Sequence, residues 1–209
     1  MKKLVILVDM DGIAADLIGR VLEMYNAEHG AVFTHADVTD WNFDKCIPKG
    51  KTIFRYFDVP GFFRQLPVIP GVARVLKDLQ KAGHDIHIAS TPHVVRRGDR
   101  EVGDPSVIKG TCTSDKLEWV EEHLPFIGAK KTILIRDKTM LKGDVLIDDK
   151  PDTIERYRET WPNSFLASIA YPYNDRVKHH LNTHAAGFSN FEQAWDTIGE
   201  QIHRFAEQP

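Results

Sequence analysis

Hydrophobic positions form two patterns along this chain: short continuous apolar runs, and longer stretches in which apolar residues recur at helical spacing. A continuous run of aliphatic residues suits a strand that is buried on both faces of a parallel sheet. We therefore predict strands over residues 4–8, 85–89, 132–135, 144–147 and 165–169.

Helical spacing occurs between these runs, and it predicts helices that begin near residues 17, 71, 114, 151 and 191. Gly30 and Gly83 are expected to end the first two, because glycine is common just after a helix C-terminus. Ser114 is expected to cap the third helix. Ser189 and Glu192 form a capping-box pattern ahead of the last one.

Strands that alternate with helices predict an α/β fold, namely a doubly wound, Rossmann-like parallel sheet flanked by helices. Residues 17–67 depart from this alternation after their first helix, with aromatic residues scattered among charges and turn formers. We expect them to form a small, mainly helical cap inserted after the first strand, on a core of residues 1–16 and 68–209. Residues 92–112 show no clear period and are expected to be a long loop.

Composition narrows the classes of partner. The 209 residues suffice for one core with a small inserted subdomain. With 27 Lys plus Arg against 30 Asp plus Glu, the formal charge is -3, so no global basic field favours duplex nucleic acid. No apolar run approaches the ~20 residues of a membrane helix. Cys46 and Cys112 match no metal-ligand spacing, and we expect two reduced thiols in a cytoplasmic protein.

Acidic and hydroxyl residues follow three of the predicted strands: Asp9 and Asp11, then Ser90 and Thr91, then Asp148 and Asp149. The carboxyl ends of parallel strands lie at one edge of a sheet, so these groups are expected to converge. Carboxylates that converge repel one another unless a cation lies among them, and hard oxygen ligands favour Mg²⁺ over zinc. The sequence therefore predicts a magnesium site at this edge.

At such a site a carboxylate can attack the phosphorus atom of a bound phosphate ester. Asp9, at the tip of the first strand, is the expected nucleophile and would form an aspartyl-phosphate. Asp11 lies in a turn that Gly12 permits, where it can protonate the leaving alkoxide and later accept a proton from water. Without the other clusters, Asp9 and Asp11 could equally be an acid-rich turn. Likewise, Ser90 and Thr91 alone could be a turn that ends a strand.

Lys116 is expected in the first turn of its helix, where the helix dipole disfavours a cation. A bound anion removes that conflict, so we interpret Lys116 as a phosphate-binding lysine beside Ser90, with a solvated surface lysine as the alternative. Of the two adjacent acids before Pro151, one, with Asp149 as the candidate, could instead cap the next helix.

These residues resemble the motif set of the haloacid dehalogenase superfamily: Asp9 and Asp11, the hydroxyl of Ser90, Lys116, and the acid pair Asp148 and Asp149. Within it, residues 8–12, 90–92, 116–120 and 136–150 resemble the 5′(3′)-deoxyribonucleotidases. The segments Arg-Asp-Lys-Thr at 136–139 and Ile-Asp-Asp-Lys at 147–150 carry the most specific part of the likeness.

The resemblance implies a set of ligands and a substrate. Asp9, the backbone carbonyl of Asp11 and the carboxylate of Asp149 would hold Mg²⁺, with Asp148 as the other candidate of the pair. Ser90, Thr91 and Lys116 would hold phosphate, and Arg136 and Lys138 would line the substrate side. The substrate would be a deoxyribonucleoside monophosphate, with a pyrimidine as the expected base, which is cleaved to nucleoside and phosphate.

The cap and the loop contribute less specific candidates. Leu17 lies where the family places a phenylalanine in its nucleoside pocket. Trp41 and Phe43 could stack on a base or could pack in the cap interior. Three arginines of the 92–112 segment could reach a second phosphate, but we favour a solvated role for them: Arg96, Arg97 and Arg100.

The resulting prediction is a cytoplasmic, magnesium-dependent phosphomonoesterase that hydrolyses deoxyribonucleoside monophosphates and that could form a homodimer. The same core chemistry also fits a sugar phosphate or a 3′-phosphorylated nucleic-acid end. Phosphoryl mutase or transferase activity differs mainly in what reaches the aspartyl-phosphate. A binding protein without turnover would be expected to have lost a motif residue, and none is lost.

Overall fold

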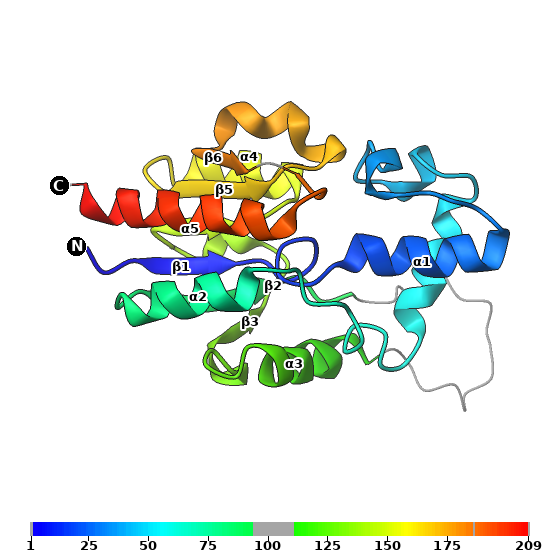
Figure 1. Ribbon diagram of the computed structural model, residues 1–209, viewed down its shortest axis with the longest axis horizontal. Helices are drawn as coiled ribbons and strands as arrows, with labels where there is room; N and C mark the ends of the chain where they lie inside the picture. The colour runs from blue at the N-terminus through cyan, green and yellow to red at the C-terminus, as the bar shows by residue number, and fades with distance from the viewer. Residues whose placement is uncertain (1, 94–110, 186, 209) are drawn as a thin grey trace.

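The computed structural model describes residues 2–93, 111–185 and 187–208, without the side chain of Asp44. Six parallel strands form one sheet in the order β3-β2-β1-β4-β5-β6 (Figure 1). Their bounds are β1 Val5–Val8, β2 Asp85–Ser90, β3 Thr132–Leu134, β4 Val145–Ile147, β5 Phe165–Ile169 and β6 Thr183–Ala185. The strand order reverses at β1, which lies between β2 and β4. The five predicted strands are confirmed, and β6 was not predicted.

Helices cover both faces of the sheet. The α-helices are α1 Leu17–His29, α2 Val72–Lys81, α3 Cys112–His123, α4 Pro151–Thr160 and α5 Phe191–Glu207. Short 3₁₀ helices join them: η1 His35–Asp37, η2 Phe43–Lys45, η3 Gly50–Asp58, η4 Ala129–Lys131, η5 Lys138–Met140 and η6 Pro172–His180. The doubly wound α/β fold that the sequence predicts is therefore confirmed.

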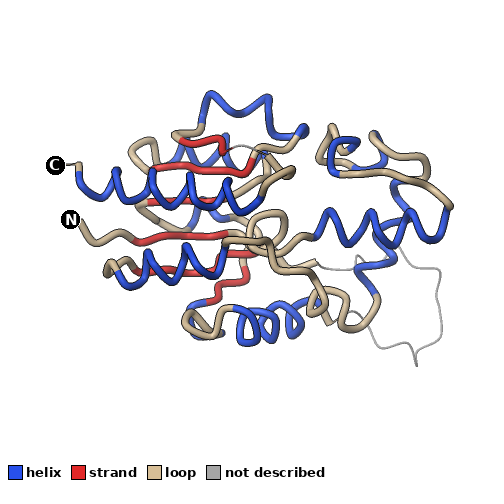
Figure 2. Tube along the Cα trace, viewed as in Figure 1, coloured by secondary structure: helices blue, strands red, loops and turns tan. Residues whose placement is uncertain are grey.

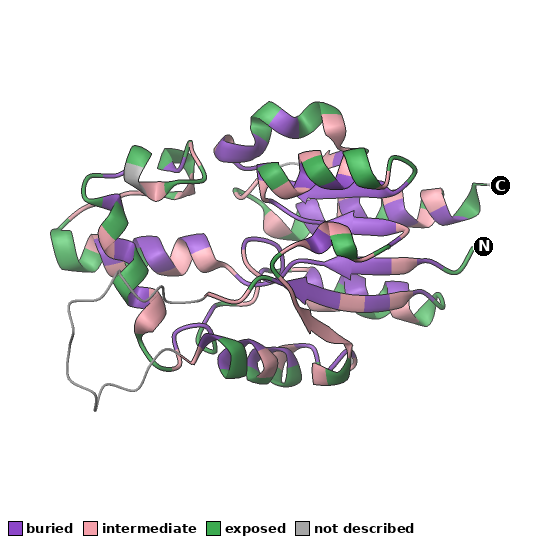
Figure 3. Ribbon diagram, turned by 180° about the vertical axis from the view of Figure 1, so that it is seen from behind, coloured by how far each residue is buried: buried purple, intermediate pink, exposed green. Residues whose placement is uncertain are grey.

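The two faces of the sheet have separate apolar cores because side chains alternate along each strand. On one face, Ile6 and Val8 of β1 pack in the larger cluster with α2 and α5. On the other, Leu7 packs with Ile154 and Tyr157 of α4. Figure 3 shows the buried strands between helices whose outer sides are exposed. Burial on both faces explains why the strands appear in the sequence as continuous apolar runs.

Residues 17–67 lie beyond the carboxyl ends of the strands and contain α1 and η1 to η3 but no described strand (Figure 2). The chain enters and leaves this segment through two neighbouring links, because the N–H of Asp16 donates to the carbonyl of Pro67 and that of Ile69 to the carbonyl of Ala14. Buried apolar residues of the segment, including Ile53 and Phe62, continue the larger core cluster.

Two buried tryptophans attach these links to the core. The indole N–H of Trp195 in α5 donates to the carbonyl of Ile13 at 3.1 Å, and that of Trp119 in α3 donates to the carbonyl of Leu66 at 2.8 Å. A buried indole N–H requires an acceptor, so each ring fixes a link while it packs in the core.

Two predicted helix caps are wrong. The helix α3 begins at Cys112 after Thr111, and the hydroxyl of Ser114 donates to the Thr111 carbonyl from within the first turn instead of capping. In α5 the capping residue is Asn190, whose side chain accepts from the N–H of Gln193, because its amide oxygen lies one residue closer to the helix than Ser189.

Of the predicted loop 92–112, residues 111 and 112 lie at the start of α3. Arg96, Arg97 and Arg100 are outside the described residues.

Cys46 and Cys112 are free thiols, and burial raises the pKa of Cys112 to about 11. Across the three described ranges, no helix has both the length and the apolar composition needed to cross a membrane.

Candidate active site

The predicted strand-end residues converge beside β1, where the strand order reverses. Asp9 follows β1, and Asp148 and Asp149 follow the neighbouring strand β4. Oxygens of these three buried carboxylates all lie within 4.8 Å of one another. A doubly wound sheet opens a crevice at this position, because the crossovers on its two sides diverge there.

Lys138 lies inside this acid cluster. Its Nζ is 2.7 Å from Oδ2 of Asp9 and also donates to Oδ2 of Asp148, and the lysine side chain is 4% exposed. Burial alone would lower the pKa of Lys138, but the two carboxylates outweigh burial and raise this pKa above its ordinary value. The resemblance placed Lys138 on the substrate side, whereas the structure places it between two acids.

The two adjacent acids of the cluster are unusually hard to ionise. Burial, opposed by Lys138 and reinforced by Asp9, raises the pKa of Asp148 to about 6. Burial, then the charges of Asp9 and Asp148, raise the pKa of Asp149 well above its usual range. One lysine cannot balance three carboxylates, so two negative charges remain when all three are ionised. That balance suits a divalent cation.

The donor atoms also fit a hard cation. Oδ1 of Asp149 is buried and has no hydrogen-bond partner among the described residues. A buried carboxylate oxygen without a donor is costly, and a bound cation would satisfy it. Three of the predicted metal ligands form the cluster: Asp9, Asp148 and Asp149. The fourth, Asp11, lies two residues after Asp9 in the chain, and its carboxylate is not one of the three.

Gly12 allows the acid cluster to form. Its φ of +75° is a left-handed conformation that disfavours side chains. A Cβ at this position would lie 2.4 Å from Oδ2 of Asp149, which is closer than atoms can approach. The turn after Asp11 therefore needs glycine both for its backbone and for the space that Asp149 occupies.

A second lysine organises the neighbouring phosphate-binding candidates. Nζ of Lys116 donates to Oδ2 of Asp11 at 2.5 Å, to Oγ of Ser90 at 2.8 Å and to the carbonyl of Thr91 at 3.0 Å, and its side chain is fully buried. The structure thus places Lys116 beside Ser90, as predicted. The predicted position in the first turn of the helix is wrong, however, because Lys116 is the fifth residue of α3 and lies beyond its first turn.

Asp11 has one oxygen on Lys116, and its other oxygen, Oδ1, is buried without a partner in the described part of the chain. Burial raises the pKa of Asp11, which Lys116 opposes and Asp9 reinforces. A carboxyl with a raised pKa gains and loses a proton more readily near neutral pH, which suits general acid and base chemistry.

The other predicted substrate residues are more dispersed. Thr91 is exposed, and its hydroxyl donates to the carbonyl of Ile135. Arg136 is exposed just beyond β3. Leu17 and Phe43 are partly buried against the larger core cluster, which for Phe43 agrees with the packing alternative. Trp41 is 39% exposed.

Sequence reasoning missed the residues that follow β5. Tyr173 is buried, and its hydroxyl donates to Oδ2 of Asp149 at 2.5 Å. Asn174 is also buried and donates to the Asp149 carbonyl at 3.3 Å. A partial signal was available, because they lie four and five residues after a predicted strand, whereas Asp9 and Asp148 follow theirs directly. An aromatic and an amide residue after a strand do not by themselves indicate a cation site, as clustered acids do.

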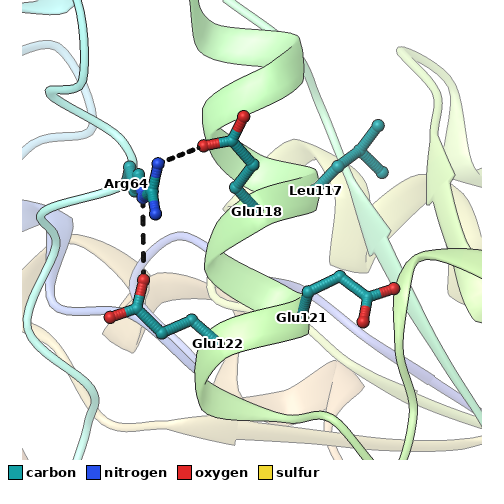
Figure 4. Close-up of a pocket in the computed structure, with 5 residues that line it drawn as sticks. All are labelled: Arg64, Leu117, Glu118, Glu121 and Glu122. Atoms are coloured by element: carbon teal, nitrogen blue, oxygen red, sulfur yellow. Dashed lines mark hydrogen bonds and ion pairs between the residues drawn. The ribbon is translucent and has the colours of Figure 1, made fainter.

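A separate surface pocket of about 480 Å³ is lined by Arg64 and by residues of α3, namely Leu117, Glu118, Glu121 and Glu122 (Figure 4). Arg64 pairs with Glu118 at 2.5 Å and with Glu122 at 3.6 Å. Three glutamates against one arginine disfavour an anionic substrate here. The chemistry therefore belongs to the strand ends and not to this pocket.

Residues 3–202 match the family model described as 5′ nucleotidase, deoxy (pyrimidine), cytosolic type C protein. A 5′(3′)-deoxyribonucleotidase of Bacillus subtilis is 30% identical over 157 residues, which are 75% of this chain and 81% of that protein. A putative 5′(3′)-deoxyribonucleotidase of Bordetella pertussis is 29% identical over 175 residues, 82% of this chain and 86% of that protein.

Solved structures show the same fold. A HAD family hydrolase of Deinococcus radiodurans with bound phosphate and sodium aligns with a TM-score of 0.55 at 14% identity, over 98% of this chain and 97% of that one. A haloacid dehalogenase-like protein of Agrobacterium tumefaciens gives a TM-score of 0.56 at 15% identity, over 97% and 99%.

Proposed function

This chain belongs to the cytosolic type C 5′-nucleotidase family of HAD phosphomonoesterases, and from that premise we propose that it is a magnesium-dependent hydrolase of deoxyribonucleoside monophosphates. The convergence of Asp9, Asp148 and Asp149 within 4.8 Å carries the proposal, because phosphate chemistry needs a cation at this point. We also propose a cytoplasmic location, in keeping with the family's description.

Asp9 is the proposed nucleophile. One of its carboxylate oxygens forms a bond to phosphorus while the bond from phosphorus to the leaving oxygen breaks, which gives an aspartyl-phosphate. The hydrogen bond from the Met10 N–H to Oδ1 of Asp9, at 2.7 Å, and the contact with Lys138 hold the carboxylate in a single orientation. A fixed nucleophile loses little entropy when it reacts.

Asp11 is the proposed acid and base. Its carboxyl donates a proton to the leaving alkoxide, and the resulting carboxylate then takes a proton from the water that attacks phosphorus. This second attack breaks the bond between Asp9 and phosphorus and releases inorganic phosphate. The raised pKa of Asp11 favours both roles, and its contact with Lys116 keeps it beside the phosphate site.

Lys116 and Ser90 are proposed to hold the phosphate oxygens, with Thr91 beside them. Asp9 and Asp149 are proposed to hold Mg²⁺ together with the Asp11 carbonyl, and Asp148 supports them through Lys138. When bound, Mg²⁺ would offset the negative charge of the phosphate. Lys138 is proposed to limit repulsion among the acids, so that the cluster remains folded between turnovers.

Residues 17–67 are proposed to form the cap that selects the leaving group, on a core of residues 1–16 and 68–209. The two adjacent links to this segment, each bonded to a buried tryptophan, support that boundary. Leu17 and Trp41 are the proposed contacts with the nucleoside. Arg136 is proposed to approach it from the core.

A substrate panel tests the proposal. Phosphate release is measured with Mg²⁺ from dUMP, dTMP, their 3′-phosphate isomers, glucose 6-phosphate and a 3′-phosphorylated oligonucleotide. The expected result is preferential turnover of the deoxyribonucleotides. Preferential turnover of the sugar phosphate or of the oligonucleotide would replace the proposed substrate, while no release from any compound would refute the proposed activity.

The nucleophile is tested separately with Asp9→Asn. We expect turnover to fall by at least about a thousandfold, because an amide cannot form the aspartyl-phosphate. Circular dichroism should show an intact fold. Near-normal activity of this variant would refute the mechanism even if the substrate assignment held.

A further inference from the structure

Tyr173 stands out as a buried hydroxyl on a residue of the acid cluster. It lies in η6, immediately after the chain leaves β5, and its side chain reaches back to β4 to donate to Oδ2 of Asp149 at 2.5 Å. The other oxygen of this carboxylate, Oδ1, lacks a partner among the described residues. The hydrogen bond from Tyr173 therefore occupies one oxygen of Asp149 and leaves the other available to a cation.

The ring of Tyr173 is held by its neighbours. It stacks on Tyr171 with centroids 5.1 Å apart and planes 11° apart, and Tyr171 stacks in turn on Phe188 at 6.1 Å. The hydroxyl of Tyr171 donates to the carbonyl of Gly12 at 2.8 Å. Aromatic stacking with a fixed hydroxyl at one end leaves the Tyr173 ring little rotational freedom.

The backbone around this stack is fixed as well. Oδ1 of Asn174 accepts from the Tyr171 N–H at 3.0 Å, and its Nδ2 donates to the carbonyl of Ile169 at 3.0 Å and to Oγ of Ser168 at 3.1 Å. Asn174 is fully buried. The loop that presents Tyr173 is thus attached to the end of β5 by side-chain hydrogen bonds.

Residues 17–67 contact the same stack. The ring of Trp41 lies edge-on to Tyr173, with centroids 5.5 Å apart and planes 69° apart. His35 of η1 stacks on Phe188 at 5.7 Å. Asp149 is therefore connected through Tyr173 to an aromatic side chain of the inserted segment.

We propose that Tyr173 is a positioning residue for the cation site: it holds Oδ2 of Asp149 so that the unpartnered Oδ1 is available to the cation, and Trp41 supports it from the inserted segment. The inference rests on the proposed metal site. A carboxylate can rotate about its own axis and exchange its two oxygens, so a donor on one oxygen preorganises the other. Partners of this kind commonly change metal affinity by about 10- to 100-fold.

The first test measures cation binding without catalysis. Mn²⁺ serves as the probe, and its free concentration is followed by electron paramagnetic resonance in wild-type protein, Tyr173→Phe and Tyr157→Phe. Tyr157 is the matched control, because its buried hydroxyl bonds to backbone at Gly143 and Leu141, away from the acid cluster. We expect the Kd of Tyr173→Phe to rise at least about tenfold and that of Tyr157→Phe to stay unchanged.

A Tyr173→Phe affinity within twofold of wild type overturns the inference while leaving the proposed metal site intact. Absence of Mn²⁺ binding by the wild-type protein refutes the metal site, and the inference with it. In turnover assays, Tyr173→Phe should need more Mg²⁺, and saturating Mg²⁺ should restore most of kcat with little change in substrate KM. Loss of kcat that Mg²⁺ does not restore contradicts a positioning role.

The second test separates the support by Trp41 from base stacking. Trp41→Ala is compared with Phe54→Ala, which removes a half-exposed ring of the same segment that packs on Phe57. With no nucleotide present, Trp41→Ala should weaken Mn²⁺ binding several-fold and Phe54→Ala should not. A raised substrate KM with unchanged Mn²⁺ affinity in Trp41→Ala would confine Trp41 to substrate binding and overturn its supporting role.

Discussion

Lys138 and Lys116 are both buried ammonium groups at the same edge of the sheet, but their partners differ. Lys138 contacts two carboxylates, Asp9 and Asp148, whereas Lys116 contacts one carboxylate and two uncharged oxygens. The first lysine sits among more negative charge than it can neutralise. The charge of the second lysine is balanced by a single carboxylate, that of Asp11.

This difference suggests a division of labour along the turn from Asp9 to Gly12. Around Lys138 the residual charge is negative, so that side attracts a cation. Around Lys116 there is only one carboxylate, that of Asp11, and the oxygens of Ser90 and Thr91 are uncharged, so this side carries no excess negative charge and can accept a phosphate oxygen. Asp9 belongs to the Lys138 side, and Asp11, only two residues later, belongs to the Lys116 side.

Removing Lys138 should have the largest effect. Lys138→Met removes the ammonium group that pairs with the buried carboxylates of Asp9 and Asp148. In EDTA the free energy of unfolding should therefore fall by about 3–5 kcal/mol. Turnover should fall more than about a thousandfold. Urea denaturation with and without Mg²⁺ tests this, and Mg²⁺ should recover much of the lost stability. Unchanged stability in EDTA would contradict the role of Lys138 in the acid cluster.

Removing Lys116 should affect the phosphate side alone. Lys116→Met should lower kcat/KM about 100- to 1000-fold, in the range for loss of one charged group that contacts the reacting phosphate. Inorganic phosphate should lose most of its inhibition, whereas Mn²⁺ affinity should change less than in Lys138→Met. Equal losses of Mn²⁺ affinity in the two variants would contradict the division between the lysines.

Gly12 joins the two sides, and a substitution there should disturb both. Gly12→Ala combines a positive φ with a Cβ 2.4 Å from Asp149, so we expect a loss of about 2–4 kcal/mol in unfolding free energy and weaker Mn²⁺ binding. Gly30→Ala is the control. Its φ is +61° but nothing lies within 4 Å, so a loss of about 1 kcal/mol and normal Mn²⁺ binding are expected.

The smallest expected effect is on pH dependence, and it concerns only the Lys138 side. The pKa of Asp148 is about 6 in the folded protein against 3.8 for an ordinary aspartate, so between these values the folded state binds more protons. Raising the pH across this window therefore favours unfolding. In EDTA, wild-type protein should lose about 2 kcal/mol more than Asp148→Asn between pH 4 and pH 7.

Denaturation curves across the pH range measure this difference. Saturating Mg²⁺ should remove most of it, because a cation favours the ionised carboxylates. Identical pH profiles for the two proteins in EDTA would show that Asp148 ionises normally in the fold.

The acid cluster could be predicted from the sequence because the end of each apolar run indicates where a strand ends. Parallel strands end at the same edge of the sheet, which places Asp9 near Asp148. The sequence could not place Lys138, since the short η5 turn that directs this side chain back to β1 leaves no periodic signal. Lys116 was identified from a helix start two residues too late. Its contacts follow from its position in the second turn.

Tyr173 shows a different limit. Its position after β5 was visible in the sequence, but its function depends on reaching across one strand to Asp149, and neither hydropathy nor spacing encodes such a reach. The strand-end rule identifies candidates, whereas the orientation of each side chain comes from packing. Aromatic residues at strand ends therefore merit the same scrutiny as acids.

The bond between Trp195 and the Ile13 carbonyl also has a consequence for biosynthesis. The turn that carries the proposed nucleophile is synthesised well before the indole that anchors it, because Trp195 follows Ile13 by 182 residues. A nascent chain that still lacks α5 would expose the apolar face of the sheet and leave this turn unanchored. Catalytic competence should therefore appear only after α5 has left the ribosomal exit tunnel.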